Sequence, residues 1–397
     1  MSEWKKVKLK DICEITSSKR IFFSEYVDIG IPFYRSKEII ELSNGQSISE
    51  PLFISETKYN DIRMKFGVPK ENDILLTSVG SIGIPYIVKK DDVFYFKDGN
   101  LTWLRNFKDF VFPTYLLYWL KSDETFNILN NIALGAAQKA LTIVKLKDVE
   151  ISLPPITTQY CIANILSCYD SLIENYQKQI KLLEEAAQRL YKEWFVDLHF
   201  PGHENTKIVD GVPEGWEKKR LSDIANIIMG QSPKSEFYNT EEDGLPFHQG
   251  VGSYGYRFVV DNVYSTSLTR IAESNSILFS VRAPVGRLNI TKNKIVIGRG
   301  LASINHKMGC QSYLYYLLKE KFFKDNIIGN GAIFASISKD ELYNLVFAIP
   351  TDEMVKRYDA IANAIDKDIQ NVDSQIRILT EARDRLLPKL MSGEIAV

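Results

Sequence analysis

The sequence has few of the residues from which metal centres and disulfide frameworks are built. It contains 4 cysteines without any CxxC spacing: Cys13, Cys161, Cys168 and Cys310. Neither a structural zinc site nor a set of disulfides is therefore expected, and a reducing, cytoplasmic location suits such a chain. His199 and His203 are close in sequence, but Pro201 and Gly202 between them prevent one helix from presenting both to a metal ion.

Long apolar segments are also missing. The longest aromatic and apolar run, at 110–120, is too short to span a membrane. The opening MSEWKKVKLKDIC has no apolar core of the kind found in secretory signals. We therefore expect no membrane span and no such signal.

No familiar catalytic motif is present. The P-loop, HExxH and nucleophile-elbow patterns are missing, as is the Asn- or Asp-Pro-Pro-aromatic tetrapeptide of amino-methyltransferases. GVGSYG at 250–255 fits GxGxxG, but the YRFVV that follows predicts a strand, whereas a dinucleotide site needs a helix there. EKK at 217–219 resembles part of a nuclease motif, yet the equivalent KKV at 5–7 has no carboxylate. We predict no catalytic residues, no metal ligands and no cofactor bound by this chain.

Neither sign of charge predominates. The net charge of −1 argues against binding that depends mainly on attraction to the phosphates of a nucleic acid. The hydrophobic fraction of 45% and the charged fraction of 25% are ordinary for a globular protein, and the length suggests two or three domains. Basic residues nevertheless gather between 257 and 307, where only Asp261 and Glu273 oppose them: Arg257, Arg270, Arg282, Arg287, Lys292, Lys294, Arg299 and Lys307.

The chain repeats itself. WKKVKLKDI at 4–12 returns as WEKKRLSDI at 216–224, IPF at 31–33 as LPF at 245–247, and NDILL at 72–76 as NSILF at 275–279. Short apolar runs between turn-forming residues predict strands. Each copy closes on proline, in EISLPP at 150–155 and NLVFAIP at 344–350. The lysine-rich opening of each copy is interpreted as a solvated strand edge.

A long periodic segment follows each closing proline. Apolar residues recur at alternating steps of four and three, which predicts two helices of roughly 50 Å at about 1.5 Å per residue. The positions predicted to pair are Ile162, Leu166, Tyr169, Ile173, Tyr176, Ile180, Leu183 and Leu190 in the first helix, and Ile365, Ile369, Val372, Ile376, Leu379 and Leu386 in the second. Gly393 is a candidate C-terminal cap of the second helix.

The two apolar seams predict an antiparallel coiled coil, and the alternative is that each seam packs on its own neighbouring domain. The chain is thus expected to be an α+β protein, ordered as domain, long helix, domain, long helix, with internal pseudo-two-fold symmetry. Arg383 interrupts the second seam. In the antiparallel arrangement it is expected to lie near Tyr169 and Asp170.

Three longer stretches resemble the specificity (S) subunits of Type I restriction-modification systems. They are LYKEWFVDLHFPGHE at 190–204, DGVPEGWEKKRLSDI at 210–224 and LLPKLMSGEIAV at 386–397. The resemblance implies a target-recognition domain at 1–154, a central spacer helix at 155–198, a second target-recognition domain at 199–350 that begins with a linker at 199–215, and a C-terminal spacer helix at 351–397.

The resemblance also implies a function without catalysis. Each recognition domain would bind one half of a bipartite, asymmetric site on double-stranded DNA, and the helices would fix the spacing of the two halves. They would also dock two methylation subunits, which methylate adenine at N6, and the full complex would add restriction subunits. S-adenosylmethionine, ATP and Mg²⁺ would be bound by those partner subunits.

Candidate DNA contacts are polar and basic residues of the two domains, many of them in the TSSKR loop at 16–20 and the GQSPKS loop at 230–235. They are Lys19, Arg20, Ser78, Gln138, Lys139, Gln231, Ser232, Lys234, Arg282, Arg287 and Arg299. Two alternatives remain: an S-like subunit of another restriction type or an orphan copy, and a coiled-coil scaffold protein without DNA specificity.

Overall fold

The computed structural model describes residues 4–45, 48–135, 139–209, 211–322 and 336–397. The chain forms two compact units: unit 1 contains residues 1–177 and 374–397, and unit 2 contains residues 178–373. Both ends of the sequence therefore belong to unit 1.

Three small sheets form the β-structure of unit 1. The first pairs β1 (Lys5–Lys8) with β10 (Glu150–Leu153) in antiparallel register. The second has the order β2-β9-β6-β7 and comprises Glu14–Thr16, Leu101–Arg105, Ile74–Thr77 and Pro85–Ile87. The third has the order β3-β5-β4-β8 and comprises Tyr26–Val27, Phe53–Ile54, Ile31–Tyr34 and Tyr95–Phe96.

Short helices join these strands. They are α1 (Leu9–Ile12), η1 (Phe23–Glu25), α2 (Ser36–Ser43), α3 (Glu56–Phe66), α4 (Pro113–Lys121), α5 (Asp123–Ile132) and α6 (Ile143–Lys147). Local chemistry sets their ends: the Ser55 side chain caps α3 by accepting from the Lys58 amide, and Gly67 ends α3 with φ +80°. All four residues of β6 are buried, as its apolar sequence predicts.

Unit 2 repeats this architecture. β13 (Glu217–Arg220) pairs with β23 (Val346–Ile349). A second sheet has the order β14-β22-β19-β20, formed by Ala225–Met229, Leu301–His306, Ile277–Ser280 and Leu288–Ile290. The third has the order β15-β17-β16-β21-β18, formed by Tyr238–Asn239, Tyr264–Ser265, Leu245–His248, Ile295–Ile297 and Ile271–Ala272.

The remaining short elements of unit 2 correspond to those of unit 1 only in part, since no α-helix within the described residues 211–322 matches α2 or α3. These elements are η2 (His203–Asn205), the hairpin of β11 (Ile208–Val209) and β12 (Val212–Pro213), α8 (Leu221–Ile224), η3 (Ser235–Phe237), η4 (Val251–Ser253), α9 (Gln311–Phe322) and α10 (Lys339–Tyr343). Each repeated sequence segment thus forms the same kind of element in both units. The opening segment forms a strand and a short helix, and the apolar runs and closing segments form strands.

Two 40-residue helices complete the fold: α7 (Ile156–Phe195), which starts directly after Pro154 and Pro155, and α11 (Asp352–Met391). Gly393 follows α11 with φ +74°, and its amide bonds the Leu390 carbonyl, as a C-terminal cap does. Within the described residues, no helix is both long and apolar enough to cross a membrane.

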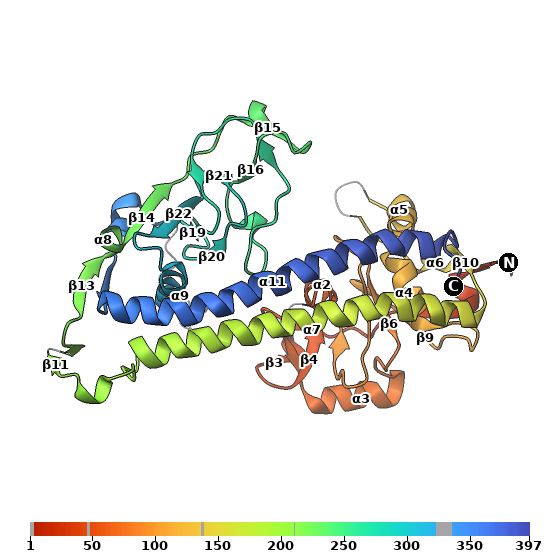
Figure 1. The fold of residues 1–397 in the computed structure, drawn as a ribbon. Helices are drawn as coiled ribbons and strands as arrows, with labels where there is room; N and C mark the ends of the chain where they lie inside the picture. The colour runs from red at the N-terminus through yellow and green to blue at the C-terminus, as the bar shows by residue number, and fades with distance from the viewer. Residues whose placement is uncertain (1–3, 46–47, 136–138, 210, 323–335) are drawn as a thin grey trace. The chain divides into compact units, whose positions relative to one another are not determined.

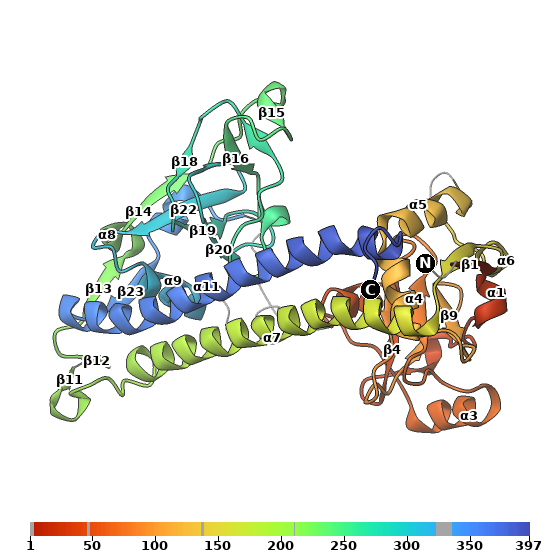
Figure 2. The ribbon, with the colours of Figure 1, turned by 45° about the vertical axis from the view of Figure 1, so that its right-hand side comes forward.

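Inside each unit, a segment of α7 lies beside a segment of α11 (Figures 1 and 2). None of the fourteen predicted seam positions is exposed. Six are buried, namely Ile162, Leu166, Ile173, Ile180, Ile369 and Val372, and eight are half-buried, namely Tyr169, Tyr176, Leu183, Leu190, Ile365, Ile376, Leu379 and Leu386. The antiparallel sense is visible in unit 1, where Ile162 shares a core cluster with Leu390 while Asp170 bonds Arg383.

The seams contact both each other and their own domains. In unit 1, Ile162 and Leu166 lie in one core cluster with Leu9 of α1 and Tyr115 of α4. In unit 2, the Tyr358 hydroxyl of α11 donates to the Ala187 carbonyl of α7 at 2.9 Å. The two alternatives drawn from the periodicity are therefore not exclusive.

The repeated tryptophans lie where the long helices end. The ring of Trp4 lies against Gly393, where an added Cβ would be 3.2 Å from it. The Trp216 ring centroid is 6.0 Å from that of Phe195, the last residue of α7, and 5.7 Å from that of Phe200. The tryptophan that opens each copy thus packs against the end of a long helix in its own unit.

One expectation was wrong, and one residue of the basic segment at 257–307 is buried. YRFVV at 256–260 forms only isolated bridges, from Phe258 to Ile290 and from Val259 to Tyr254, and no strand. Arg257 is 1% exposed, so it does not belong to a basic surface. Its guanidinium is paired with Glu184 and Asp366, residues distant in sequence that no local pattern reveals.

Candidate nucleic-acid interface

Hydrogen bonds bring four segments of domain 1 together. The loop after β2 reaches the segment before β9, because the Ser17 hydroxyl accepts from the Gly99 amide at 3.4 Å and donates to the carbonyl of Leu101, the first residue of β9, at 3.1 Å. The Ser78 amide, just after β6, donates to the Asn100 carbonyl at 2.8 Å. The Leu141 amide then donates to the Ser78 carbonyl at 2.8 Å, which adds the 139–141 segment to the group. We call this group the domain 1 loops.

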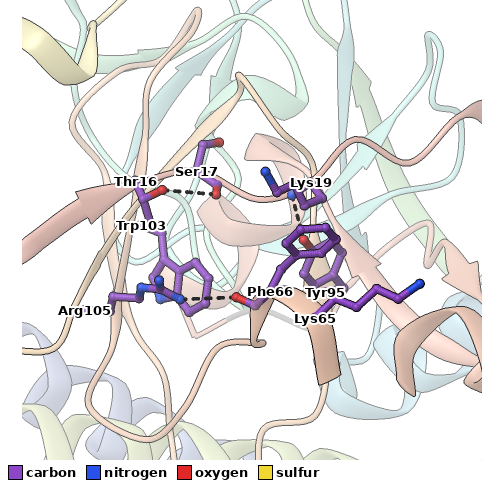
Figure 3. Close-up of a pocket in the computed structure, with 8 residues that line it drawn as sticks. All are labelled: Thr16, Ser17, Lys19, Lys65, Phe66, Tyr95, Trp103 and Arg105. Carbon is purple, nitrogen blue, oxygen red and sulfur yellow. Dashed lines mark hydrogen bonds between the residues drawn. The ribbon is translucent and has the colours of Figure 1, made fainter. Parts of the chain in front are cut away.

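A cavity of about 310 Å³ opens beside these loops (Figure 3). It is lined by Thr16, Ser17, Lys19, Lys65, Phe66, Tyr95, Trp103 and Arg105. The Lys19 ammonium lies 4.7 Å from the centre of the Phe66 ring, and the Arg105 guanidinium lies 4.4 Å from the centre of the Trp103 ring. Cations held over aromatic faces are positioned without losing their charge.

Hydrogen bonds fix the walls of the cavity. The Lys19 amide donates to the Tyr95 hydroxyl at 2.7 Å, and the Trp103 indole donates to Asp73 at 2.9 Å. Burial raises the pKa of Asp73 and outweighs the opposing effect of its hydrogen bonds. The Glu14 carboxylate accepts from Arg105 at 2.7 Å, and this bond lowers the pKa of Glu14.

Charge in the cavity is mostly positive. Arg105 is paired with Glu14, whereas Lys19 and Lys65 form no ion pair within the described part of the chain. Both lysines are exposed, and Phe66 beside them is 48% exposed. Ammonium groups next to an open aromatic face suit a phosphate and its attached nucleotide.

The equivalent loops of unit 2 form a tighter group. The Ser232 hydroxyl donates to the Gln249 side chain at 2.7 Å, and the Arg299 amide donates to the Ser232 hydroxyl at 3.2 Å. The Thr269 hydroxyl holds the Gln231 carbonyl at 2.7 Å. The side chains of Gln231 and Arg299 remain exposed. We call this group the domain 2 loops.

Glycines allow this close approach. A Cβ on Gly298 would lie 2.6 Å from the Gln249 side-chain oxygen, and one on Gly300 would lie 2.5 Å from the Gln249 carbonyl. A Cβ on Gly230 would lie 2.1 Å from the Gly298 carbonyl. The loops that carry Gln231, Gln249 and Arg299 can therefore pack together only because glycines flank these residues.

The loop after β19 joins the same group. The Val281 amide donates to the Gly300 carbonyl at 2.9 Å, and Arg282 forms an isolated bridge with Ser336. This matches domain 1, where Ser78 bonds Asn100 and Val79 bridges Ala140. Arg282 and Arg287 are both exposed in the connection between β19 and β20. Arginine and amide side chains are the groups that distinguish base edges in the major groove.

The remaining predicted contacts differ in their surroundings. Arg20 pairs with Asp98 at 2.9 Å, Lys234 lies 3.8 Å from Glu236, and Lys139 donates to Asn130 at 2.8 Å. The Ser78 side chain is 2% exposed and bonded to Thr102, so it does not lie on the surface where it was expected. Gln138 lies outside the described residues.

Several residues of these loops escaped the sequence reasoning. Lys65, Phe66, Trp103 and Arg105 come from the end of α3 and from β9, far in sequence from the TSSKR loop that they adjoin. Gln249 is the equivalent omission in unit 2. An adjacent glycine could have indicated Gln249 in the sequence, since Gln231, Gln249 and Arg299 each have a glycine next to them.

Comparison with known proteins identifies the family. Residues 1–185 and 213–379 match the family described as Type I restriction modification DNA specificity domain. A proposed specificity subunit of type I restriction enzyme MjaX from Methanocaldococcus jannaschii is 32% identical over 100% of this chain and 94% of its own length. The specificity subunit of type I restriction enzyme MjaIX from the same organism is 29% identical, with the same coverage.

The fold is also found in a solved structure. The S subunit of a Type-I restriction-modification system from M. genitalium shares 18% identity and a TM-score of 0.58, over 98% of this chain and 96% of its own. The matches cover both repeated domains and both long helices, so this chain belongs to the Type I restriction-modification DNA specificity family.

Proposed function

We propose that this chain is the DNA sequence-recognition subunit of a Type I restriction-modification complex, in which each recognition domain binds one half of a bipartite, asymmetric site. The observation that carries the proposal is the duplication of the loop group. Each unit brings together three segments: the loop after β2 or β14, the segment before β9 or β22, and the loop after β6 or β19. Their side chains differ, as two different half-sites would require.

The long helices are assigned a second role. We propose that α7 and α11 fix the spacing between half-sites and dock two methylation subunits, which methylate adenine at N6. The described helices support this assignment because they retain exposed apolar residues beside their buried seams, such as Leu172, Leu182 and Ile378. Covering these side chains with a partner subunit would remove apolar surface from water, which favours association.

Catalysis is assigned to the partners. In this proposal the chain carries no catalytic residue, and S-adenosylmethionine, ATP and Mg²⁺ are bound by the methylation and restriction subunits. Part of the grip on DNA phosphates would also come from those subunits, which agrees with a net charge of −1 here.

A domain exchange tests the proposal. Residues 1–154 are replaced by the corresponding domain of a relative with a different target, and the chain is expressed with its methylation subunits. Sequencing of methylated adenines is expected to show one half of the recognition sequence changed and the other half retained. An unchanged methylation pattern would support a scaffold without DNA specificity.

A further inference from the structure

Arg257 is a charged side chain buried inside unit 2. It lies between η4 and β17 and is 1% exposed. Its guanidinium nitrogens lie 3.1 Å from Glu184 and 2.6 Å from Asp366, and its central carbon lies 3.5 Å from the centre of the Tyr315 ring. A guanidinium this deeply buried is stable only when charged partners surround it.

The partners of Arg257 belong to three helices. Glu184 is on α7, Asp366 is on α11, and Tyr315 is on α9. One side chain from the recognition domain therefore holds the segments of both long helices that lie in the same unit. The planar guanidinium suits this task because it can bond two carboxylates and stack on a ring at the same time.

Unit 1 contains an equivalent contact, in which the arginine comes from a different element. Asp170 accepts hydrogen bonds from the Tyr118 hydroxyl at 2.7 Å and from Arg383 at 2.6 Å. Asp366 likewise accepts from the Tyr316 hydroxyl at 2.9 Å and from Arg257 at 2.6 Å. The arginine at Asp170 comes from α11, whereas the arginine at Asp366 comes from the recognition domain. Only the second arrangement ties a domain to the helices through that arginine.

The segment that carries Arg257 leads directly to the domain 2 loops. The Ser253 hydroxyl lies 2.7 Å from the His248 ring, whose other nitrogen lies 2.9 Å from Asp261. His248 is 1% exposed, so both ends of the segment are fixed to one buried ring. Gln249 comes next, and it accepts hydrogen bonds from the Ser232 hydroxyl and the Gly300 amide.

We propose that Arg257 is a positioning residue for sequence recognition by the second domain. By anchoring the 249–261 segment to α7, α9 and α11, it holds Gln249, and through Gln249 the loops of Ser232 and Arg299, in the orientation that binds DNA. This inference rests on the proposed function. It assigns the role to one half of the protein, because Arg383 does not belong to a recognition domain.

The test uses Arg257→Lys in the full complex with methylation subunits. Lysine keeps the charge but cannot bond two carboxylates with one planar group or stack flat on Tyr315. Methylation rates are measured on duplexes with single base changes in each half-site, the halves being assigned by the domain exchange. Discrimination in the half bound by domain 2 is expected to fall about tenfold, equal to ~1.4 kcal/mol, and discrimination in the other half is expected to persist.

Arg383→Lys is the matched control, since it weakens the equivalent contact from a helix residue. It is expected to lower stability without altering discrimination in either half. If Arg257→Lys keeps full discrimination, or loses it equally in both halves, the proposal is wrong. A wild-type complex that ignores base changes in both halves would instead contradict the proposed function.

A second variant covers the case in which Arg257→Lys fails to fold. In Arg257→Met with Asp366→Asn, Glu184 keeps its ion pair with Lys319 at 3.4 Å, so no buried charge loses its last partner, and the same selective loss is expected. Hydrogen exchange of the free chain gives a reading without DNA. Amides at 249–261 and 230–232 are expected to exchange faster in either variant, while those of unit 1 keep their rates; unchanged rates at 249–261 would overturn the anchoring role.

Discussion

Two arginines bind carboxylates of the long helices, Arg383 in unit 1 and Arg257 in unit 2. Arg383 interrupts an otherwise apolar seam, and its expected position beside Asp170 is confirmed by a 2.6 Å ion pair. The interruption was itself the signal. Arg257 gave none, because its partners lie 73 and 109 residues away and its neighbours in sequence resemble a surface segment. A residue whose environment is built entirely from distant helices could not be distinguished from a surface cation.

Lys19 provides a prediction at the same scale. Lys19→Ala is expected to weaken DNA binding by the complex to a similar extent on all sequences, because a lysine over Phe66 suits a phosphate contact. The slope of log affinity against log salt should decrease by ~0.9, the value for one lost phosphate contact. Titrations at several KCl concentrations measure this. Lys5→Ala, at an exposed site on β1, is the control, and a loss restricted to one DNA sequence would contradict the phosphate assignment.

Among the elements, the sequence predicted those with a strong local pattern. The apolar runs at 74–76 and 277–279 lie in β6 and β19, and the alternating steps of four and three locate α7 and α11. Two-residue strands such as β3, β5, β15 and β17 could not be predicted, since a periodicity cannot be recognised in two residues. The loops that meet in each domain were partly identified by composition, while their contacts depend on sheet order and therefore on the whole domain.

The seam of α7 can be tested with neighbouring residues. Ile180 is 2% exposed and Leu182 is 65% exposed on the same helix. Ile180→Asp is expected to destabilise the chain by about 3–5 kcal/mol because it buries an unpaired carboxylate. Leu182→Asp should change stability by no more than about 0.5 kcal/mol. Urea unfolding of the isolated chain measures both, and equal effects would contradict the seam.

At the scale of the molecule, the sequence repeat and the structural units do not coincide. The repeat predicts the order domain, helix, domain, helix. The units, however, divide both helices, so unit 1 takes residues 156–177 of α7 together with the end of α11. Nothing in a periodic seam marks where one unit stops, because the same apolar pattern continues through 177 and 178.

A shortened chain tests this division. A chain ending at residue 373 lacks Leu386, Leu390 and Met391, which pack in the main core of unit 1, and Arg383, which pairs with Asp170. Limited proteolysis is expected to cleave residues 4–177 rapidly while unit 2 resists. A chain ending at residue 395 keeps that cluster and should behave like the full chain. Equal resistance of both units in the shorter chain would show that unit 1 does not need these residues.

The division of the helices also bears on the order in which the protein is completed during synthesis. Domains usually fold as units in the order in which they leave the ribosome. Here the residues of unit 2 are all present once residue 373 has been added, whereas unit 1 still lacks 374–397. Until those residues are translated, the core cluster that contains Ile162 and Leu166 lacks Leu386, Leu390 and Met391. The domain that the ribosome makes first is therefore the one that is finished last.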